Sequence, residues 1–258
     1  MEQCFENGFL ARGEYNPGGT RHYQYCTAFP IGTMLAQSWN TCLLQEVGAA
    51  VGYEMALFGV SLWLAPGMNI HRSPLCGRNF EYFSEDPLLS GQMAAAITRG
   101  VQSCPGCGVT LKHFACNNQE TERLESNSLV SERALREIYL RGFQIAVQSA
   151  QPSAIMTSYN LVNGVHAANS AALCTAIARC EWGFAGIFMT DWDTTSSRRC
   201  TAEGCIQAGN DLLMPGSRRE YSALLCALRD GRLDRRLLRS CDGRIIKTAL
   251  GLSAPTAP

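Results

Sequence analysis

Polar side chains that could act on a sugar follow four short apolar runs of the sequence. They are Arg78, Lys112, His113, Tyr159, Asp191 and Trp192. A carboxylate among hydrogen-bond donors suits a sugar, because hydroxyl groups form directed hydrogen bonds and the apolar face of the sugar ring can stack on tryptophan. Phosphate-ester and aldolase-type barrel enzymes use the same residue types, so the pattern alone leaves these classes open.

Each of these residues also has a structural interpretation. Asp191 could cap the segment that follows it, and Lys112 with His113 could form a buried structural pair. Arg78 could pair with Glu81 or Glu85 on a solvated loop. We interpret the two histidines His71 and His166 as structural. Because no cluster of histidines and carboxylates has metal-ligand spacing, we predict no catalytic metal and no cofactor.

Short apolar runs alternate with amphipathic segments along the chain. The apolar runs, interpreted as buried strands, are residues 60–65, 109–111, 154–157, 186–190 and 212–214. Helices are expected over 35–58, from Pro87 to about 101, from the N-cap Ser131, from about 171, over 205–208 and over 233–245. Strands that alternate with helices predict a parallel sheet whose strand ends carry the functional residues.

The predicted fold class is therefore α/β, a TIM-type (β/α) barrel with parallel strands and outer helices. About five strand–helix units are recognisable, whereas a full barrel has eight, so the barrel is expected to be incomplete. The expected organisation is an irregular N-terminal segment over 1–27, the barrel domain over 28–250 and a tail over 251–258.

Composition excludes several classes of partner. The 258 residues carry 22 basic and 22 acidic side chains, and charged residues make up 17% of the chain. This balance favours a neutral substrate over nucleic acid or an anionic membrane surface. No apolar stretch is long enough to span a membrane, and the N-terminus lacks the pattern of a signal peptide, so we expect a cytoplasmic protein.

Thirteen cysteines are scattered through the sequence. In a chain of this length they are expected to be reduced, buried side chains of a cytosolic protein. The one Cys-x-x-Cys motif, Cys104 to Cys107, encloses Pro-Gly and has no second pair at zinc-finger spacing. It is interpreted as a turn.

Four longer motifs resemble glycoside hydrolase family 3. They are Gly77-Arg78-Asn79-Phe80-Glu81-Tyr82-Phe83-Ser84-Glu85-Asp86-Pro87, Lys112-His113-Phe114-Ala115, Ser158-Tyr159-Asn160-x-x-Asn163-Gly164 and Met189-Thr190-Asp191-Trp192. They follow the order and spacing of the family, and the similarity runs from about residue 28 to about residue 250. The run Lys112-His113-Phe114-Ala115-Cys116 resembles the β-glucosidase branch rather than the N-acetylhexosaminidase branch.

The resemblance implies retaining hydrolysis of β-glycosides in a barrel domain. Asp191 matches the nucleophile of the family, and Trp192 would lie beside the sugar. The positions that match residues gripping the sugar in the −1 subsite are Arg78, Lys112, His113, Arg123 and Tyr159.

Two family features are missing from the sequence. The first barrel strand of the family usually ends in Asp-Gly-Pro, which is not found here. The general acid/base usually comes from a sandwich domain, which is also absent, so the chain is expected to pack against such a domain. We therefore expect a β-glucosidase-like hydrolase that takes a β-glucoside or oligosaccharide. The alternatives are a catalytically silent or sugar-binding barrel fragment, and another glycosyl transfer such as phosphorolysis or transglycosylation.

Overall fold

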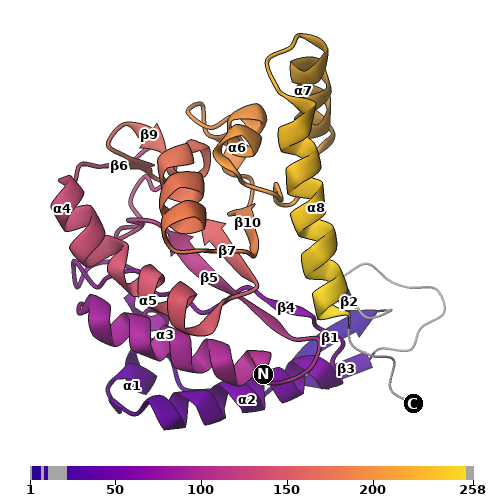
Figure 1. The fold of residues 1–258 in the computed structure, drawn as a ribbon. Helices are drawn as coiled ribbons and strands as arrows, with labels where there is room; N and C mark the ends of the chain where they lie inside the picture. The colour runs from indigo at the N-terminus through magenta and orange to yellow at the C-terminus, as the bar shows by residue number, and fades with distance from the viewer. Residues whose placement is uncertain (1, 7–8, 11–21, 254–258) are drawn as a thin grey trace. The chain divides into compact units, whose positions relative to one another are not determined.

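A parallel sheet forms the centre of residues 31–258 in the computed structural model, which describes residues 2–6, 9–10 and 22–253 (Figure 1). Its strands are β4 (Leu62–Trp63), β5 (Gly108–Phe114), β7 (Ala154–Thr157) and β10 (Ile187–Thr190). The spatial order is β10-β7-β5-β4, and every neighbouring pair is parallel. Consecutive strands of the sequence are thus neighbours in space, as in a β/α barrel.

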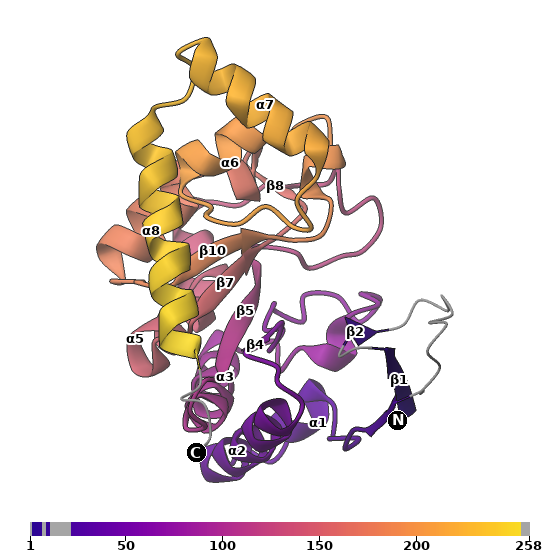
Figure 2. The same ribbon diagram turned by 90° about the vertical axis from the view of Figure 1, so that its right-hand side faces the viewer.

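Helices precede, connect and follow these strands along the chain (Figure 2). The longer ones are α2 (Thr41–Leu57), α3 (Pro87–Gln102), α5 (Arg141–Ala150), η4 (Ala172–Glu181), α7 (Arg218–Arg229) and α8 (Arg235–Leu252). The shorter ones are α1 (Gly32–Ala36), η1 (Asn79–Glu81), α4 (Glu132–Ala134), η2 (Leu135–Tyr139), η3 (Ala167–Asn169), η5 (Thr194–Ser196) and α6 (Ala202–Ala208). The four hydrogen-bonded strands form an open arc, so the predicted incomplete (β/α) barrel is confirmed.

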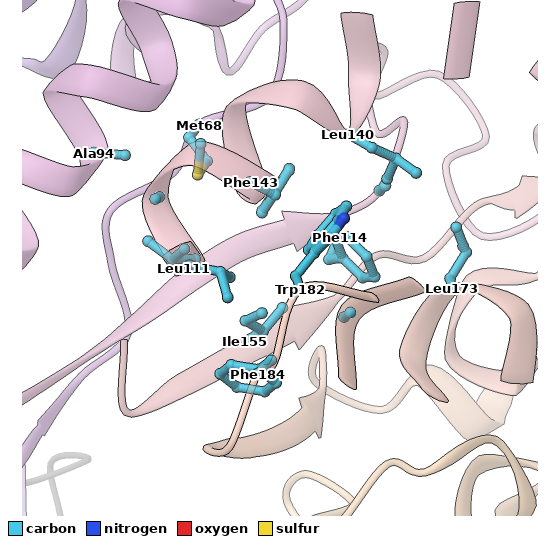
Figure 3. Packing of buried hydrophobic residues seen from close by; sticks show 14 of the residues in the cluster. Met68, Ala94, Leu111, Phe114, Leu140, Phe143, Ile155, Leu173, Trp182 and Phe184 are labelled. Atoms are coloured by element: carbon cyan, nitrogen blue, oxygen red, sulfur yellow. The ribbon is translucent and has the colours of Figure 1, made fainter. Parts of the chain in front are cut away.

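The larger hydrophobic core lies between the sheet and the helices α3, α5 and η4 (Figure 3). Leu111, Ile155 and Phe188 point into it from three adjacent strands. Phe114 packs edge-on against Phe143 of α5 at a ring-centroid distance of 5.2 Å. Burial of these side chains fixes which face of each strand packs against the helices.

Alternate residues of the same strands form a second apolar cluster on the inner face of the arc. It contains Ala154, Met156, Ile187, Met189 and Met214, with Leu62, Leu64 and Ile245 packed against it. Ile245 belongs to α8, which Figure 1 shows on the side of the strands away from α3 and α5. The strands are therefore apolar on both faces, which explains their continuous hydrophobic runs in the sequence.

Residues 1–30 form a separate unit. Its three strands, β1 (Glu2–Glu6), β2 (Phe9–Leu10) and β3 (His22–Tyr25), make an antiparallel sheet in the order β2-β1-β3. The sequence analysis expected an irregular segment over 1–27 and placed the domain boundary at 27/28, whereas the structure shows strands there and divides the units after Pro30. Residues 7–8 and 11–21 of that segment, and 254–258 of the expected tail, lie outside the described residues.

Several elements differ from those expected, and helix α7 was not predicted. The single helix predicted over 35–58 is two helices, because the chain turns at Trp39, which has a positive φ of 53°. The strand predicted over 212–214 is a single parallel bridge between Met189 and Leu212. A small sheet of β6 (Asn127–Ser128), β8 (Leu161–Val162) and β9 (Val165–His166) was not predicted.

A buried carboxylate ties the start of β10 to two outer helices. Asp211 Oδ2 accepts hydrogen bonds from Arg179 of η4 at 2.6 Å and from the Phe188 amide at 2.7 Å. Arg244 of α8 donates to Asp211 Oδ1 at 2.7 Å. The Asp211 side chain is fully buried and that of Arg179 is largely buried, so this ion pair is shielded from water. Asp211 therefore holds the start of β10, the strand that Asp191 directly follows.

Replacing Asp211 with Ala should lower the free energy of unfolding by about 3–5 kcal/mol, because Arg179 would stay buried without its counter-charge. Asp230→Ala is the matched control, since Asp230 pairs with Arg232 at the exposed surface. That control should change stability by less than about 1 kcal/mol. Urea unfolding measures both variants, and equal losses would show that the Asp211 network adds nothing beyond a surface pair.

Candidate active site

All seven residues predicted for the site line one cavity of about 380 Å³. They are Arg78, Lys112, His113, Arg123, Tyr159, Asp191 and Trp192. Two apolar side chains from the inner face of the arc, Leu64 and Met156, complete the lining. The cavity is large enough for a single sugar ring and combines polar groups with an apolar floor, as small-molecule sites usually do.

The parallel sheet explains why these residues meet. Asp191 follows directly after β10, and Tyr159 follows two residues after β7. Lys112 and His113 lie within the last residues of β5, not after it as the sequence analysis expected. Their strand is longer than predicted because residues 65–68 continue alongside it, with the Met68 amide donating to the Lys112 carbonyl at 2.7 Å. All these positions lie at the carboxyl edge of the sheet.

Asp191 presents one unpaired carboxylate oxygen to the site. Its Oδ1 accepts a hydrogen bond from the Trp192 amide at 2.8 Å, whereas Oδ2 has no hydrogen-bond partner among the described residues. Burial raises the pKa of Asp191, while the Trp192 amide, the Tyr159 hydroxyl and the cations Arg78 and Lys112 oppose that rise. Its side chain is only 7% exposed, so Oδ2 is a poorly solvated oxygen. Such an oxygen is suited to attack a carbon atom held beside it.

His113 is a neutral neighbour of that carboxylate. Its Nε2 lies 3.6 Å from Asp191 Oδ2. Burial holds the pKa of His113 well below its usual range, and the positive charges of Arg78 and Lys112 act in the same direction. The contact between His113 and Asp191 is therefore not an ion pair.

Two residues that the sequence analysis did not single out position His113. Asn69 accepts from the His113 amide and donates to the His113 carbonyl, both at 2.8 Å. The hydroxyl of the buried Tyr82 lies 3.2 Å from Nδ1 of the ring. Asn69 Oδ1 also lies 3.3 Å from Nδ1, but a proton on Nδ1 would leave the bare Nε2 facing the Asp191 carboxylate at 3.6 Å. With Tyr82 donating to Nδ1 instead, the ring proton sits on Nε2 and faces Asp191. In this tautomer His113 is a hydrogen-bond donor to the cavity.

The two cations nearest Asp191 share one acidic partner. Arg78 is hydrogen-bonded to Glu81, and Lys112 Nζ lies 3.6 Å from the other oxygen of Glu81. Arg78 thus makes the ion pair that the structural interpretation offered and still lines the cavity. Glu81 thus positions both cations at the cavity, although its own side chain does not line the cavity.

The far wall combines a stacked cation with aromatic rings. The Arg123 guanidinium lies 4.7 Å from the Tyr159 ring centroid and pairs with Glu120 at 2.7 Å. The Tyr159 hydroxyl donates to the Trp192 carbonyl at 2.8 Å, which fixes the backbone next to Asp191. The Trp192 side chain is half exposed and offers an apolar surface at the mouth of the cavity.

Asp191 is the only carboxylate among the residues that line this cavity. The neighbouring acids Glu81 and Glu120 are engaged with arginines, and Glu203 pairs with Arg232. Among the described residues no three histidine, cysteine or acidic side chains gather where they could hold a metal ion. No helix in the described part of the chain is long and apolar enough to cross a membrane.

Comparisons with known proteins identify the family of the chain. The family model "Glycosyl hydrolase family 3 N terminal domain" matches residues 12–248. The chain is 52% identical over 166 residues to β-glucosidase A of Butyrivibrio fibrisolvens, covering 64% of this chain and 20% of that protein. It is 48% identical over 205 residues to an exo-α-(1→6)-L-arabinopyranosidase of Bifidobacterium longum, covering 80% and 26%.

Solved structures show the same fold. β-Glucosidase 3B of Thermotoga neapolitana, in complex with glucose, superposes with a TM-score of 0.86 at 45% identity, covering 94% of this chain and 34% of that one. The β-glucosidase DesR of Streptomyces venezuelae, in complex with D-glucose, gives 0.82 at 31% identity, with 91% and 31% covered. The chain thus spans about a third or less of these relatives. It belongs to glycosyl hydrolase family 3, within the N-terminal barrel domain of that family.

Proposed function

We propose that this chain is the nucleophile-bearing part of a retaining β-glucosidase. The observation that carries the proposal is the buried Asp191 Oδ2, which has no hydrogen-bond partner among the described residues and belongs to a side chain that lines a sugar-sized cavity with several donors. Relatives named β-glucosidases, including the two solved with glucose that are described above, support a glucoside as the substrate.

In this mechanism Asp191 Oδ2 attacks the anomeric carbon. The bond to the leaving oxygen breaks, and a glycosyl ester of Asp191 forms. Retaining hydrolysis requires a second carboxyl group about 5–5.5 Å from the first, which protonates the leaving oxygen and later activates water. Because Asp191 is the only carboxylate lining the cavity, we propose that another part of the parent protein, a sandwich domain packed against the barrel, supplies the acid.

The remaining residues bind the sugar. Lys112, His113 and Arg78 are placed to donate hydrogen bonds to its hydroxyl groups. His113 donates from a neutral ring, so it strengthens binding without neutralising Asp191. Trp192 would stack on the apolar face of the ring. Arg123 stacks on the Tyr159 ring and thereby positions the Tyr159 side chain at the cavity.

Covalent trapping tests this proposal. A 2-deoxy-2-fluoro-β-glucoside with a dinitrophenolate leaving group should add one glycosyl mass to the chain, and peptide mapping should place it on Asp191. A label on Asp193 or Asp211 would contradict the assignment. Glucose binding without any label would favour the sugar-binding alternative, and label transfer to added phosphate would indicate phosphorolysis.

A second substrate class follows from the relatives. Two exo-α-(1→6)-L-arabinopyranosidases of Bifidobacterium are 47% and 48% identical to this chain. Activated β-D-glucopyranosides and α-L-arabinopyranosides should therefore be compared at equal concentration. Faster phenolate release from the arabinopyranoside would assign the site to that class instead.

Replacing Lys112 with Ala should reduce kcat/KM for an activated glucoside at least about tenfold, because a hydrogen bond from a charged donor is worth roughly 1.5–3 kcal/mol. Lys247 on α8 is the only other lysine of the sequence and is exposed, so Lys247→Ala is the matched control. Phenolate release measured in the chain and in the parent enzyme gives the ratio. If both alanine variants kept wild-type kinetics, Lys112 would be structural.

A further inference from the structure

A second group of reactive side chains lies next to α6, away from the cavity lining. The sulfur atoms of Cys200 and Cys205 are 3.6 Å apart. Both side chains are buried, and Asn169 of η3 donates a hydrogen bond to the Cys205 sulfur at 3.1 Å. The same Asn169 holds the Thr201 backbone between the two cysteines, accepting from its amide at 3.0 Å. The two sulfurs are thus kept in contact by a neighbouring segment.

His166 completes this group. It is 2% exposed, and its Nδ1 accepts from the Ala168 amide at 3.2 Å. A neutral ring with this bond carries its proton on Nε2. Nε2 is buried and has no hydrogen-bond partner among the described residues. The ring interacts electrostatically with Cys200. The arrangement therefore contains a buried donor that a Cys200 thiolate would satisfy.

The environment distinguishes the two thiols. The hydrogen bond with Cys205 lowers the pKa of Cys200 against the effect of burial, and His166 and Asn169 lower it further. The same hydrogen bond, together with burial, raises the pKa of Cys205. These opposite directions favour Cys200 as the attacking thiol and Cys205 as the resolving thiol of the contacting pair.

The Cys-x-x-Cys motif lacks these features. The Cys104 thiol donates to the Ala49 carbonyl at 3.6 Å, and the Cys107 thiol donates to the Gly52 carbonyl at 3.4 Å. Burial raises the pKa of Cys107. Each thiol of the motif is thus engaged by the backbone of α2, so the motif serves as an internal comparison. Cys200 and Cys205 could also have a purely structural role. They lie just before the N-cap Thr201 and in the first turns of α6, where two apolar side chains often pack together. Such packing does not require a buried histidine donor beside them.

We propose that Cys200 and Cys205 form a thiol-oxidation site that reacts with hydroperoxides. The Cys200 thiolate attacks a peroxide oxygen, an S–O bond forms and the O–O bond breaks. The leaving hydroxide takes up a proton to become water, which leaves a sulfenic acid on Cys200. The Cys205 sulfur then attacks the Cys200 sulfur, the S–O bond breaks, and the hydroxyl leaves with the Cys205 proton as a second water. Two thiols are oxidised to a disulfide, and one hydrogen peroxide is reduced to two waters.

Peptide mapping of the folded chain after limited hydrogen peroxide treatment tests this site. Trypsin releases Cys200 and Cys205 together in residues 200–218, and Cys104 and Cys107 together in residues 100–112. Each disulfide appears as the loss of two hydrogens from one peptide. The peptide 200–218 should be oxidised at least about tenfold faster than 100–112, because thiolate character and proximity favour it. In urea-unfolded protein the difference should disappear.

Two variants separate the steps. Cys205→Ser should accumulate a sulfenic acid on Cys200 that dimedone captures, whereas Cys200→Ser should give neither a disulfide nor a dimedone adduct in residues 200–218. Circular dichroism melting checks that both variants fold. Equal oxidation of the two peptides in the folded chain, or no dimedone adduct on Cys200 in a folded Cys205→Ser variant, would overturn the proposal. These readouts do not depend on glycosidase activity.

Discussion

Replacing Asp191 with Asn should reduce the release of phenolate from a dinitrophenyl β-glucoside by at least about a thousandfold. The amide keeps the shape of the side chain but lacks the charge needed to attack the anomeric carbon. The measurement is the pre-steady-state burst, which counts the fraction of chain molecules that form the glycosyl ester. Asp193→Asn is the matched control, because Asp193 lies two residues away, is exposed, and belongs to the same loop. It should retain the burst.

The stability of the same variant shows whether a loss of activity reflects chemistry or misfolding. Burial raises the folded-state pKa of Asp191, so the folded protein binds its proton more tightly than the unfolded chain does. Stability contributed by this group is therefore fully present below the unfolded pKa and is lost as pH rises through the raised pKa. Asn carries no such charge, so Asp191→Asn should be at least as resistant to urea as wild type at neutral pH. A burst that survives in this folded variant would exclude Asp191 as the nucleophile.

The hydrophobic pattern predicted the parallel strands whose ends carry Tyr159 and Asp191, whereas the full set of seven site residues came from the resemblance to the family. The apolar runs before Tyr159 and Asp191 have the lengths of buried strands, and the carboxyl ends of parallel strands meet at one edge. The seven residues come from separate parts of the sequence and line one cavity. The location of those that follow the strands could be predicted without knowledge of side-chain contacts, because it depends only on the topology of the sheet.

The partners of these residues could not be predicted in the same way. Asn69 lies 44 residues before His113, and Tyr82 lies 31 residues before it, so their contacts depend on how a long loop folds back over β5. Periodicity carries no information about such loops. By contrast, the missed hairpin between β8 and β9 had a local signal. Asn163 and Gly164 both have positive φ, as the Asn-Gly turn of a two-residue hairpin requires.

The bridge at residues 212–214 shows why a short apolar run does not ensure a strand. The Asp211 and Leu212 amides both donate to the Phe188 carbonyl, and the Met214 amide donates to the Thr190 hydroxyl rather than to a carbonyl. The segment therefore follows β10 in parallel without completing a ladder. Asp211 in this segment forms ion pairs with Arg179 and Arg244. Both arginines lie more than 30 residues away in the sequence, so the local pattern does not predict these contacts.

The leaving group should decide whether this chain shows any turnover by itself. A dinitrophenolate departs without protonation, so attack by Asp191 alone suffices to release it. The alkoxide of a natural disaccharide such as cellobiose must be protonated as it leaves, and general acid assistance is worth roughly 100- to 10,000-fold. Among the described residues Asp191 is the only carboxylate that lines the cavity, so no second carboxyl group from that part of the chain is placed there as an acid.

We therefore expect the purified chain to give a burst with the dinitrophenyl glucoside and to hydrolyse cellobiose no faster than its Asp191→Asn variant. Added azide should turn over the trapped ester, because this nucleophile needs no base to attack the anomeric carbon. Cellobiose hydrolysis that is robust in the chain and abolished in Asp191→Asn would contradict the expectation. It would require an acid from within the chain, and Glu120 and Glu203 would be the first to replace with Gln. Each pairs with an arginine, so either would first have to leave Arg123 or Arg232 to reach the leaving oxygen.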